Sequence, residues 1–125
     1  SGISSENFVV FWQTFRKAII ESNSSQIIQF CTFPVKYRGP LDHDATVEIS
    51  KDRFSKVFSL FLKQWNGEDL EGSTELDIIK KLKQPKEINF EKQVRIGSMI
   101  FLLKDGRWKL NFLYLNNETI DLLNK

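Results

Sequence analysis

The sequence of 125 residues has few of the side chains that build reactive centres: one cysteine, one histidine and one methionine. A single cysteine excludes an internal disulfide and a zinc site made of several cysteines, and a single histidine excludes a set of imidazole ligands. The longest apolar run, residues 99–103, is far shorter than the roughly 20 residues that a membrane helix requires. We therefore expect no metal, no cofactor and no membrane span.

The chain also lacks a strong excess of charge. Its formal net charge is +2, and both signs are spread along the sequence without a basic stripe. Binding of nucleic acid through phosphate neutralisation needs such a stripe, so we expect no nucleic-acid partner. The six glycines are isolated, which excludes the glycine-rich loops that bind phosphates.

Aromatic residues are plentiful, and phenylalanine supplies 11 of them. Phenylalanine has no polar atom that must be satisfied, so this composition suits a large apolar core or a deep apolar pocket. The length fits one domain, and we take residues 1–125 as that domain.

Two segments have apolar residues at spacings of three and four, the pattern of an amphipathic helix. The first begins near Ser4 or Ser5 as N-cap, and the second begins at Ser50. The residues of these stripes are Phe8, Phe11, Trp12, Phe15, Ala18 and Ile19, then Phe54, Val57, Phe58, Phe61, Leu62 and Trp65. We interpret both stripes as core faces; the alternative is a ligand-binding aromatic surface that includes Trp12 and Trp65.

Shorter elements lie between and after these helices. Residues 24–31 predict a helix that buries Cys31, and Pro34 ends it. Residues 35–38 alternate like an edge strand. Thr74 predicts the N-cap of a helix over 75–84, and residues 118–125 predict a terminal helix.

The last third changes from a helical to an extended pattern. Residues 93–103 and 107–116 flank Asp105-Gly106, a strong signal for one long β-hairpin. Alternation places Phe112 and Tyr114 on the same face as Trp108 and Leu110. Both faces become apolar toward one end, so we expect one face under the helices and the other under a partner chain or the C-terminal tail. Helices followed by a curved antiparallel sheet predict the α+β class.

The segments FWQTFRKAI, SSQIIQFCTFPVKYRG, RFSKVFSLF and GRWKLNFL, in this order, resemble the NTF2-like, or cystatin-like, superfamily. The resemblance spans about Phe8 to Leu115 and is greatest to uncharacterised bacterial secreted and periplasmic members. It implies a sheet wrapped around the first helix as a cone with an apolar pocket, a homodimer through the sheet, and export to the periplasm or envelope. Ketosteroid isomerase-like and scytalone dehydratase-like members are enzymes, whereas many others bind ligands or partners.

The segment Asp42-His43-Asp44 contains the only histidine, whose ordinary pKa suits acid/base work. Adjacent residues of an extended segment point to opposite sides, so His43 cannot share a face with both carboxylates. We interpret the segment as a polar loop. Cys31 with His43 as nucleophile and base is an alternative, but a buried cysteine more often packs as a small hydrophobe.

Tyr114 and Arg95 are the other candidates, because a phenol and a guanidinium among apolar residues can bind a ligand carboxylate. The alternative is that the Tyr114 hydroxyl lies at a rim and Arg95 faces solvent. We expect a non-enzymatic domain that binds a small apolar ligand or a protein partner. The alternatives are a general acid/base enzyme that uses His43, Tyr114 and Arg95, and a structural accessory domain of an envelope assembly.

Overall fold

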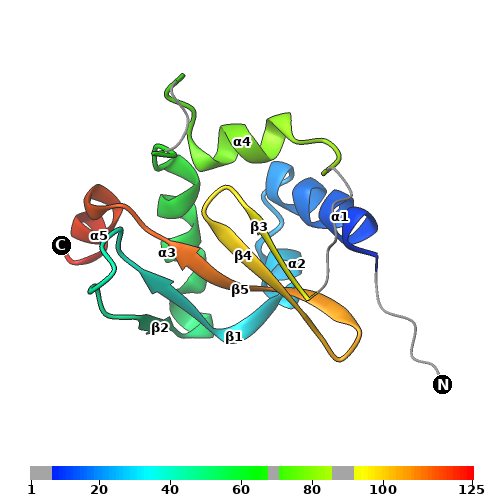
Figure 1. Cartoon of the computed structure of the whole chain (residues 1–125), viewed down its shortest axis with the longest axis horizontal. Helices are drawn as coiled ribbons and strands as arrows, with labels where there is room; N and C mark the ends of the chain where they lie inside the picture. The colour runs from blue at the N-terminus through cyan, green and yellow to red at the C-terminus, as the bar shows by residue number, and fades with distance from the viewer. Residues whose placement is uncertain (1–6, 68–70, 86–91) are drawn as a thin grey trace.

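The computed structural model describes residues 7–67, 71–85 and 92–125 (Figure 1). This part of the chain has the predicted α+β class, with five helices and one five-stranded mixed sheet. In chain order the elements are α1 (Phe8–Ile20), α2 (Ser24–Gln29), β1 (Cys31–Arg38), β2 (Val47–Ile49), α3 (Lys51–Lys63), α4 (Glu75–Lys81), β3 (Gln93–Ile96), β4 (Met99–Lys104), β5 (Arg107–Tyr114) and α5 (Asn117–Leu123).

The strand order is β2-β1-β5-β4-β3. β1 runs parallel to β5, and the other neighbouring strands are antiparallel, so the expectation of a purely antiparallel sheet is wrong. β1 is also not an edge strand, because β2 and β5 flank it. Pro34 has no N–H to donate, and it lies where the register between β1 and β5 shifts, between Cys31 and Lys36.

The predicted single strand over residues 93–103 is two strands. Gly97 and Ser98 form a tight turn, and Ile96 pairs with Met99 across it. Gly97 has a φ of 56°, in the left-handed region that such a turn requires and that glycine adopts without strain. The C-terminal third is therefore a three-stranded meander, with the predicted hairpin at Asp105-Gly106 as its second turn.

A β-bulge in β5 decides which residues face the helices. Ile100 pairs with Phe112, but the next residue of β4, Phe101, pairs with Leu110, so Asn111 is an extra residue in β5. One extra residue reverses the alternation beyond it. Leu113 therefore faces inward, while Phe112 and Tyr114 face outward, and their predicted grouping with Trp108 and Leu110 is wrong.

The apolar stripe of α1 lies in the core as predicted. All six of its residues are buried, and Trp12 donates a hydrogen bond from Nε1 to the Leu82 carbonyl at 2.7 Å. Aromatic rings of α1 pack edge-on against β4, with the Phe15 and Phe101 centroids 5.2 Å apart. Asn7 is the N-cap, accepting from the Val9 N–H, whereas the predicted caps Ser4 and Ser5 lie outside the described residues.

The stripe of α3 is buried at Phe54, Val57, Phe58 and Phe61, but the helix ends at Lys63. Trp65 therefore lies beyond the helix and is 51% exposed, so its predicted place in the buried stripe is wrong.

The next helix, α4, begins at the predicted N-cap Thr74. Thr74 and Asp77 form a reciprocal capping box, and these hydrogen bonds lower the pKa of the Asp77 carboxyl.

Cys31 is the first residue of β1, not the end of α2. Its thiol is buried and donates to the Ile27 carbonyl at 3.3 Å. Burial raises the pKa of Cys31 to about 12, although the charge of Lys109 opposes this shift. The thiol therefore stays protonated at neutral pH and is a packing residue.

Candidate functional site

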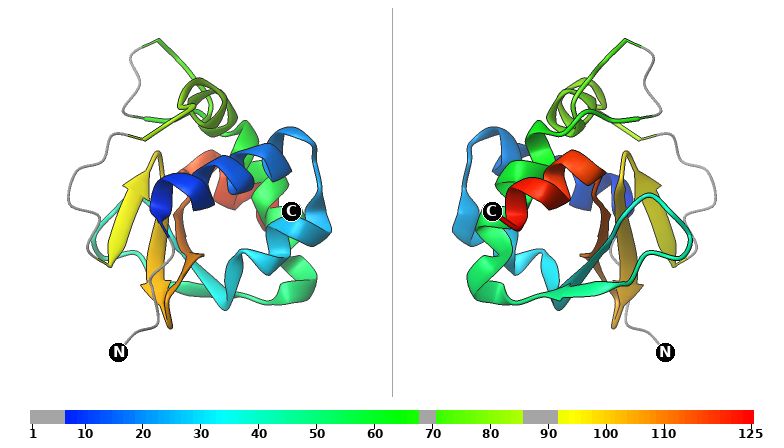
Figure 2. Two further views of the ribbon diagram at one scale, coloured as in Figure 1. Left: turned by 90° about the vertical axis from the view of Figure 1, so that its right-hand side faces the viewer. Right: turned by 90° about the vertical axis from the view of Figure 1, so that its left-hand side faces the viewer.

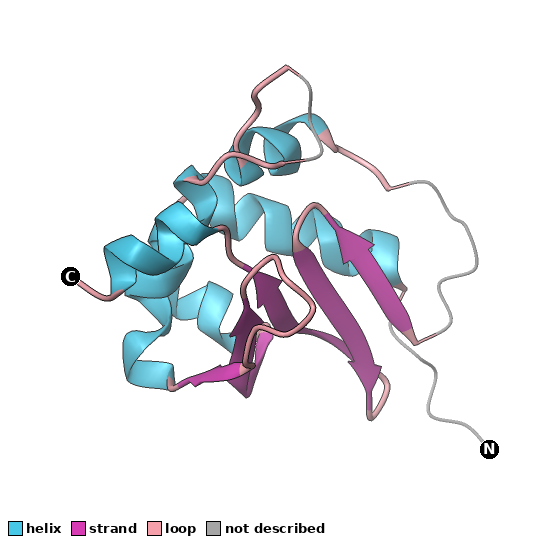
Figure 3. Cartoon of the chain, turned by 60° about the vertical axis from the view of Figure 1, so that its left-hand side comes forward, coloured by secondary structure: helices cyan, strands magenta, loops and turns pink. Residues whose placement is uncertain are grey.

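The two sides of the sheet differ in what covers them. Helices α1, α2, α3 and α5 lie on one side, which we call the inner side, and no described helix lies on the other, the outer side (Figures 2 and 3). α5 packs against α3 on the inner side, so the expectation that the C-terminal tail covers the outer side is wrong. The outer side is therefore a sheet surface that no described helix covers, and a surface site can lie on it.

Partly exposed apolar and aromatic side chains lie together on the outer side. Ile100 and Phe112 are cross-strand neighbours, and Phe112 contacts Tyr114 with ring centroids 5.0 Å apart. None of these residues packs against the core cluster. Together with the cations around them they form what we call the outer patch: Lys36, Arg38, Arg95, Ile100, Leu102, Phe112 and Tyr114.

Two guanidinium groups approach the Tyr114 ring. The Arg38 group lies 5.4 Å from the ring centroid and the Arg95 group 4.9 Å, both within cation–π range. Arg38 pairs directly with Tyr114 from β1, whereas Arg95 reaches the ring from β3. The fold thus brings together two like charges that are 57 residues apart in sequence, with one aromatic ring between their strands.

The charges of the strands are almost all positive. The five strands contain six cations, Lys36, Arg38, Arg95, Lys104, Arg107 and Lys109, and one anion, Glu48. The inner side is apolar, so these charges lie on the outer side or at its rim. The small net charge of the whole chain therefore hides a positive surface on the sheet.

Arg38 has an unsatisfied donor. Its Nε is buried and has no hydrogen-bond partner among the described residues, whereas Arg95 donates from Nε to the Gly97 carbonyl at 3.1 Å. A buried donor without a partner is destabilising by about 1–3 kcal/mol and is uncommon in folded proteins. Arg38 is therefore held in place by packing on Tyr114 and not by hydrogen bonds of its Nε.

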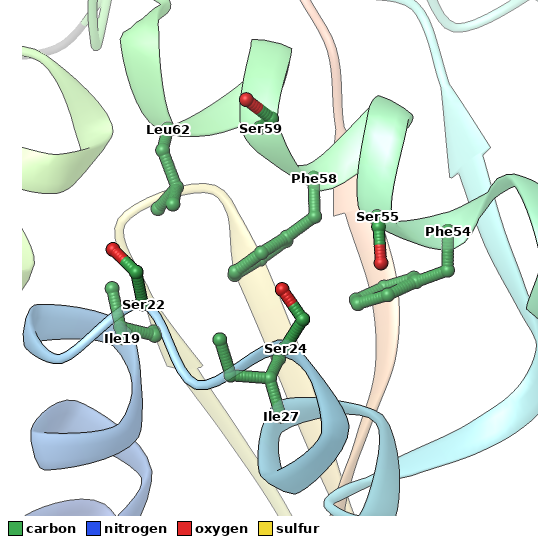
Figure 4. A pocket seen from close by; sticks show the side chains of 9 residues that line it. All are labelled: Ile19, Ser22, Ser24, Ile27, Phe54, Ser55, Phe58, Ser59 and Leu62. Carbon is green, nitrogen blue, oxygen red and sulfur yellow. The ribbon is translucent and has the colours of Figure 1, made fainter.

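A second candidate is a pocket between α2 and α3, with a volume of about 150 Å³ (Figure 4). Its floor is apolar and its rim carries four hydroxyl groups, and no charged residue lines it. The lining residues are Ile19, Ile27, Phe54, Phe58 and Leu62, with Ser22, Ser24, Ser55 and Ser59. Its chemistry suits a small neutral molecule.

The third polar cluster surrounds the buried carboxylate of Glu75, which is 1% exposed. Oε1 accepts from the Ser98 N–H at 3.0 Å, and Oε2 accepts from the Ser98 hydroxyl at 2.8 Å. Asn66 Nδ2 donates to both oxygens, and Gln64 Nε2 donates to Oε2 at 3.3 Å. These donors are all neutral, and the cluster joins the end of α3, the start of α4 and the β3–β4 turn.

The structure places the predicted site residues in different regions. Tyr114 and Arg95 are brought together on the outer side, where Arg95 also lines an open pocket with Ile78 and Leu82 of the α4 region. His43 is exposed in the β1–β2 loop and has no hydrogen bond in the described part of the chain; the Asp44 carboxylate closes this loop by accepting from the Leu41 N–H. Cys31 is the first residue of β1, and His43 lies in the loop after its last residue, Arg38. The length of the strand, roughly 20 Å, separates the buried thiol from the exposed imidazole, so they do not form a pair.

Trp12 and Trp65 have different environments: Trp12 is fully buried, whereas Trp65 follows α3 and is half-exposed.

Arg38, Phe112 and Glu75 were not identified as site residues from the sequence. The alternation of residues 35–38 already separates Lys36 and Arg38 from Val35 and Tyr37, so it was the available signal for Arg38. No comparable signal indicates that Glu75 is buried.

Among the described residues, no three histidine, cysteine, aspartate or glutamate side chains gather in a way that could hold a metal ion. No helix of the described segments has the length and apolarity to cross a membrane. No family model matches the chain, and searches of the curated proteins and of the solved structures found no match either.

Proposed function

We propose that this chain is a non-enzymatic, NTF2-like binding domain that takes a protein partner on its outer patch. The observation that carries the proposal is the group of partly exposed apolar and aromatic side chains on the side of the sheet that no described helix covers. Surface clusters of this kind mark interaction sites. Tyrosine, phenylalanine and arginine are also the residues enriched at the centres of protein interfaces.

The inner side supports this choice, because side chains fill it. Phe15 of α1, Phe61 of α3 and Phe101 of β4 are each 0% exposed. Space that a small ligand would occupy inside an NTF2-like cone is here occupied by aromatic rings. We therefore favour a partner on the outer patch over an apolar ligand in the centre of the domain.

Catalysis is the less favoured alternative. Proton-transfer sites pair a carboxylate with a phenol or second acid in one apolar cavity. Here the buried carboxylate of Glu75 is occupied by neutral donors beside the β3–β4 turn, whereas the Tyr114 ring lies on the outer side. An accessory role in an envelope assembly agrees with a partner on the outer patch, and export stays a prediction of the resemblance.

Selection of random displayed peptides against the immobilised chain tests the proposal. The bound peptides are then measured against Phe112→Ser and against Val10→Ser, a matched control on α1 where Val10 is 58% exposed. We expect the Phe112 change to weaken binding about tenfold or more, the effect of losing an interface hot spot, and the Val10 change to leave it intact. Equal binding to both variants would contradict the proposal.

A neutral ring-sized molecule in the α2–α3 pocket is the second candidate. The pocket volume of about 150 Å³ is near that of apolar cavities that take a single aromatic ring, and below the range of ordinary ligand sites. Titration with phenol, followed through the methyl groups of Ile19 and Ile27, tests it. We expect shifts that the pocket-filling change Ser59→Leu abolishes; shifts that persist in that variant would exclude the pocket.

A further inference from the structure

Resting on the proposed function, we infer that the partner is an acidic protein segment, and that the outer patch reads two carboxylates on either side of an apolar side chain. Arg38 and Arg95 supply the first part of the argument. Both guanidinium groups are held against one tyrosine ring. Two positively charged groups, each with several N–H donors, therefore lie close together before any partner binds. A carboxylate between them would accept charge-assisted hydrogen bonds and reduce their repulsion.

The order of residues across the sheet supplies the second part. One row of the outer side runs Glu48, Lys36, Phe112, Ile100, Arg95, from β2 through β1, β5 and β4 to β3, so Lys36 has the carboxylate of Glu48 on one side and the apolar pair on the other. An apolar pair thus lies between two cations. Three strand spacings of about 4.8 Å separate the two cations of this row by roughly 14 Å, which an extended peptide covers in about four residues. The matching ligand has acidic residues at positions 1 and 5 and an apolar residue at position 3.

Charge argues against a second copy of this chain in the same place. In a two-fold symmetric contact the same patch lies on both subunits, so cations would face cations. The strands contain only one anion, Glu48, to offset six positive charges. Like-charge contacts suppress the wrong partner, whereas an acidic segment is complementary.

Charge alone would also suit a nucleic acid, but the aromatic residues do not. Proteins that bind single strands offer aromatic faces on which bases stack. Here Arg38 and Arg95 already contact the Tyr114 ring, so a base would have to displace a guanidinium group. The outer patch therefore fits a carboxylate better than a stacked base.

Arginine side-chain NMR on the full chain tests the inference. The five arginines each give an Nε–Hε signal, and Arg53, exposed on α3, serves as an internal control. The probes are acetyl-Glu-Ser-Phe-Ser-Glu-amide and its matched Gln-Ser-Phe-Ser-Gln counterpart. We expect the Glu peptide to shift the signals of Arg38 and Arg95 with little effect on Arg53, and to bind about tenfold more tightly than the Gln peptide. Arg38→Gln should remove this difference, whereas Arg53→Gln should keep it.

The inference is wrong if the Glu peptide causes no shift of the Arg38 and Arg95 signals, or shifts the Arg53 signal equally. It is also wrong if the Glu and Gln peptides bind equally, or if an oligothymidine shifts the Arg38 and Arg95 signals and binds more tightly than the Glu peptide. The displayed peptides separate this failure from failure of the proposed function. If binding of the selected peptides depends on Phe112 but the peptides have no excess of Asp and Glu, the outer patch remains the proposed binding surface and the acidic partner is contradicted. If their binding does not depend on Phe112, both the proposed function and the acidic partner are contradicted.

Discussion

The inner and outer sides of the sheet are built from the same strands, but they differ in how far apolar side chains are buried and polar groups are hydrogen-bonded. On the inner side, Phe101 is fully buried, and beside the β3–β4 turn even the carboxylate of Glu75 has donors for both oxygens. On the outer side, Ile100 and Phe112 stay partly exposed and Arg38 Nε has no partner in the described part of the chain. The inner side is satisfied within the described part of the chain, whereas the outer side keeps partly exposed apolar area and a buried donor that the described residues do not satisfy. This difference is the physical basis for placing the partner there.

Deleting Asn111 is the strongest way to break the comparison. Without the extra residue, Phe112 and Tyr114 would turn inward, and Leu113, now 0% exposed, would turn to solvent. We expect a loss of more than about 5 kcal/mol of unfolding free energy, because several core contacts are lost together. Urea denaturation should show no cooperative transition; a stable variant would mean that the bulge does not set the two faces. Asn111→Ala, which keeps the residue, is the control and should fold.

Truncating one phenylalanine on each side compares the two sides directly. Phe101→Ala removes a ring at 0% exposure and should lower the unfolding free energy by about 3–5 kcal/mol. Phe112→Ala removes a partly exposed ring and should lower it by about 1 kcal/mol. Urea denaturation of both variants measures these values. Equal losses would show that the outer side contributes as much to folding as the inner side.

The polar groups give a smaller contrast. Glu75→Gln puts an amide N–H₂ among donors, so at least one donor loses its acceptor, and we expect a loss of about 2 kcal/mol. Arg38→Gln, on the outer side, removes both an unsatisfied buried donor and a cation–π contact; because these effects are opposite in sign, we expect stability to change by less than about 1 kcal/mol. Thermal denaturation of the two variants measures both changes in stability. The prediction is wrong if Arg38→Gln is the more destabilising change.

The last effect appears only at alkaline pH and concerns Cys31. Its folded pKa of about 12 lies above the ordinary 9.0, so the unfolded chain loses the thiol proton first and folding stability falls as pH rises from 9 toward 12. At pH 10 the loss is about 1.4 kcal/mol. Comparison with Cys31→Ala isolates it from other titrating groups: between pH 8 and pH 10 the wild type should lose about that much more than the variant. Equal losses would mean that the thiol is accessible in the folded state.

Much of the fold could be predicted from local patterns. The stripes of α1 and α3 follow helical spacing, and the Thr74 cap and the Asp105-Gly106 turn act on their immediate neighbours. The turn at Gly97 was also within reach, since glycine inside an extended run often marks a turn or a bulge. Such features depend on a few consecutive residues, so the sequence alone reveals them.

The candidate site could not be predicted in the same way, because it depends on pairings between distant segments. The bulge at Asn111 has no distinctive residue type, yet it decides the direction of Phe112 and Tyr114. Parallel pairing of β1 with β5 then brings Arg38 beside Tyr114. The positive charge of the sheet follows only after each cation has been assigned to a side, which a net charge of +2 does not show.

The most direct test of the outer patch is a set of intermolecular NOEs between a selected peptide and methyl groups of the chain. Ile100 and Leu102 report on the outer side, whereas Ile19, Ile27 and Leu62 report on the α2–α3 pocket. We predict NOEs from the peptide to Ile100 and Leu102 and none to the pocket methyl groups. NOEs to the pocket methyl groups alone would contradict the assignment of the outer patch as the binding surface.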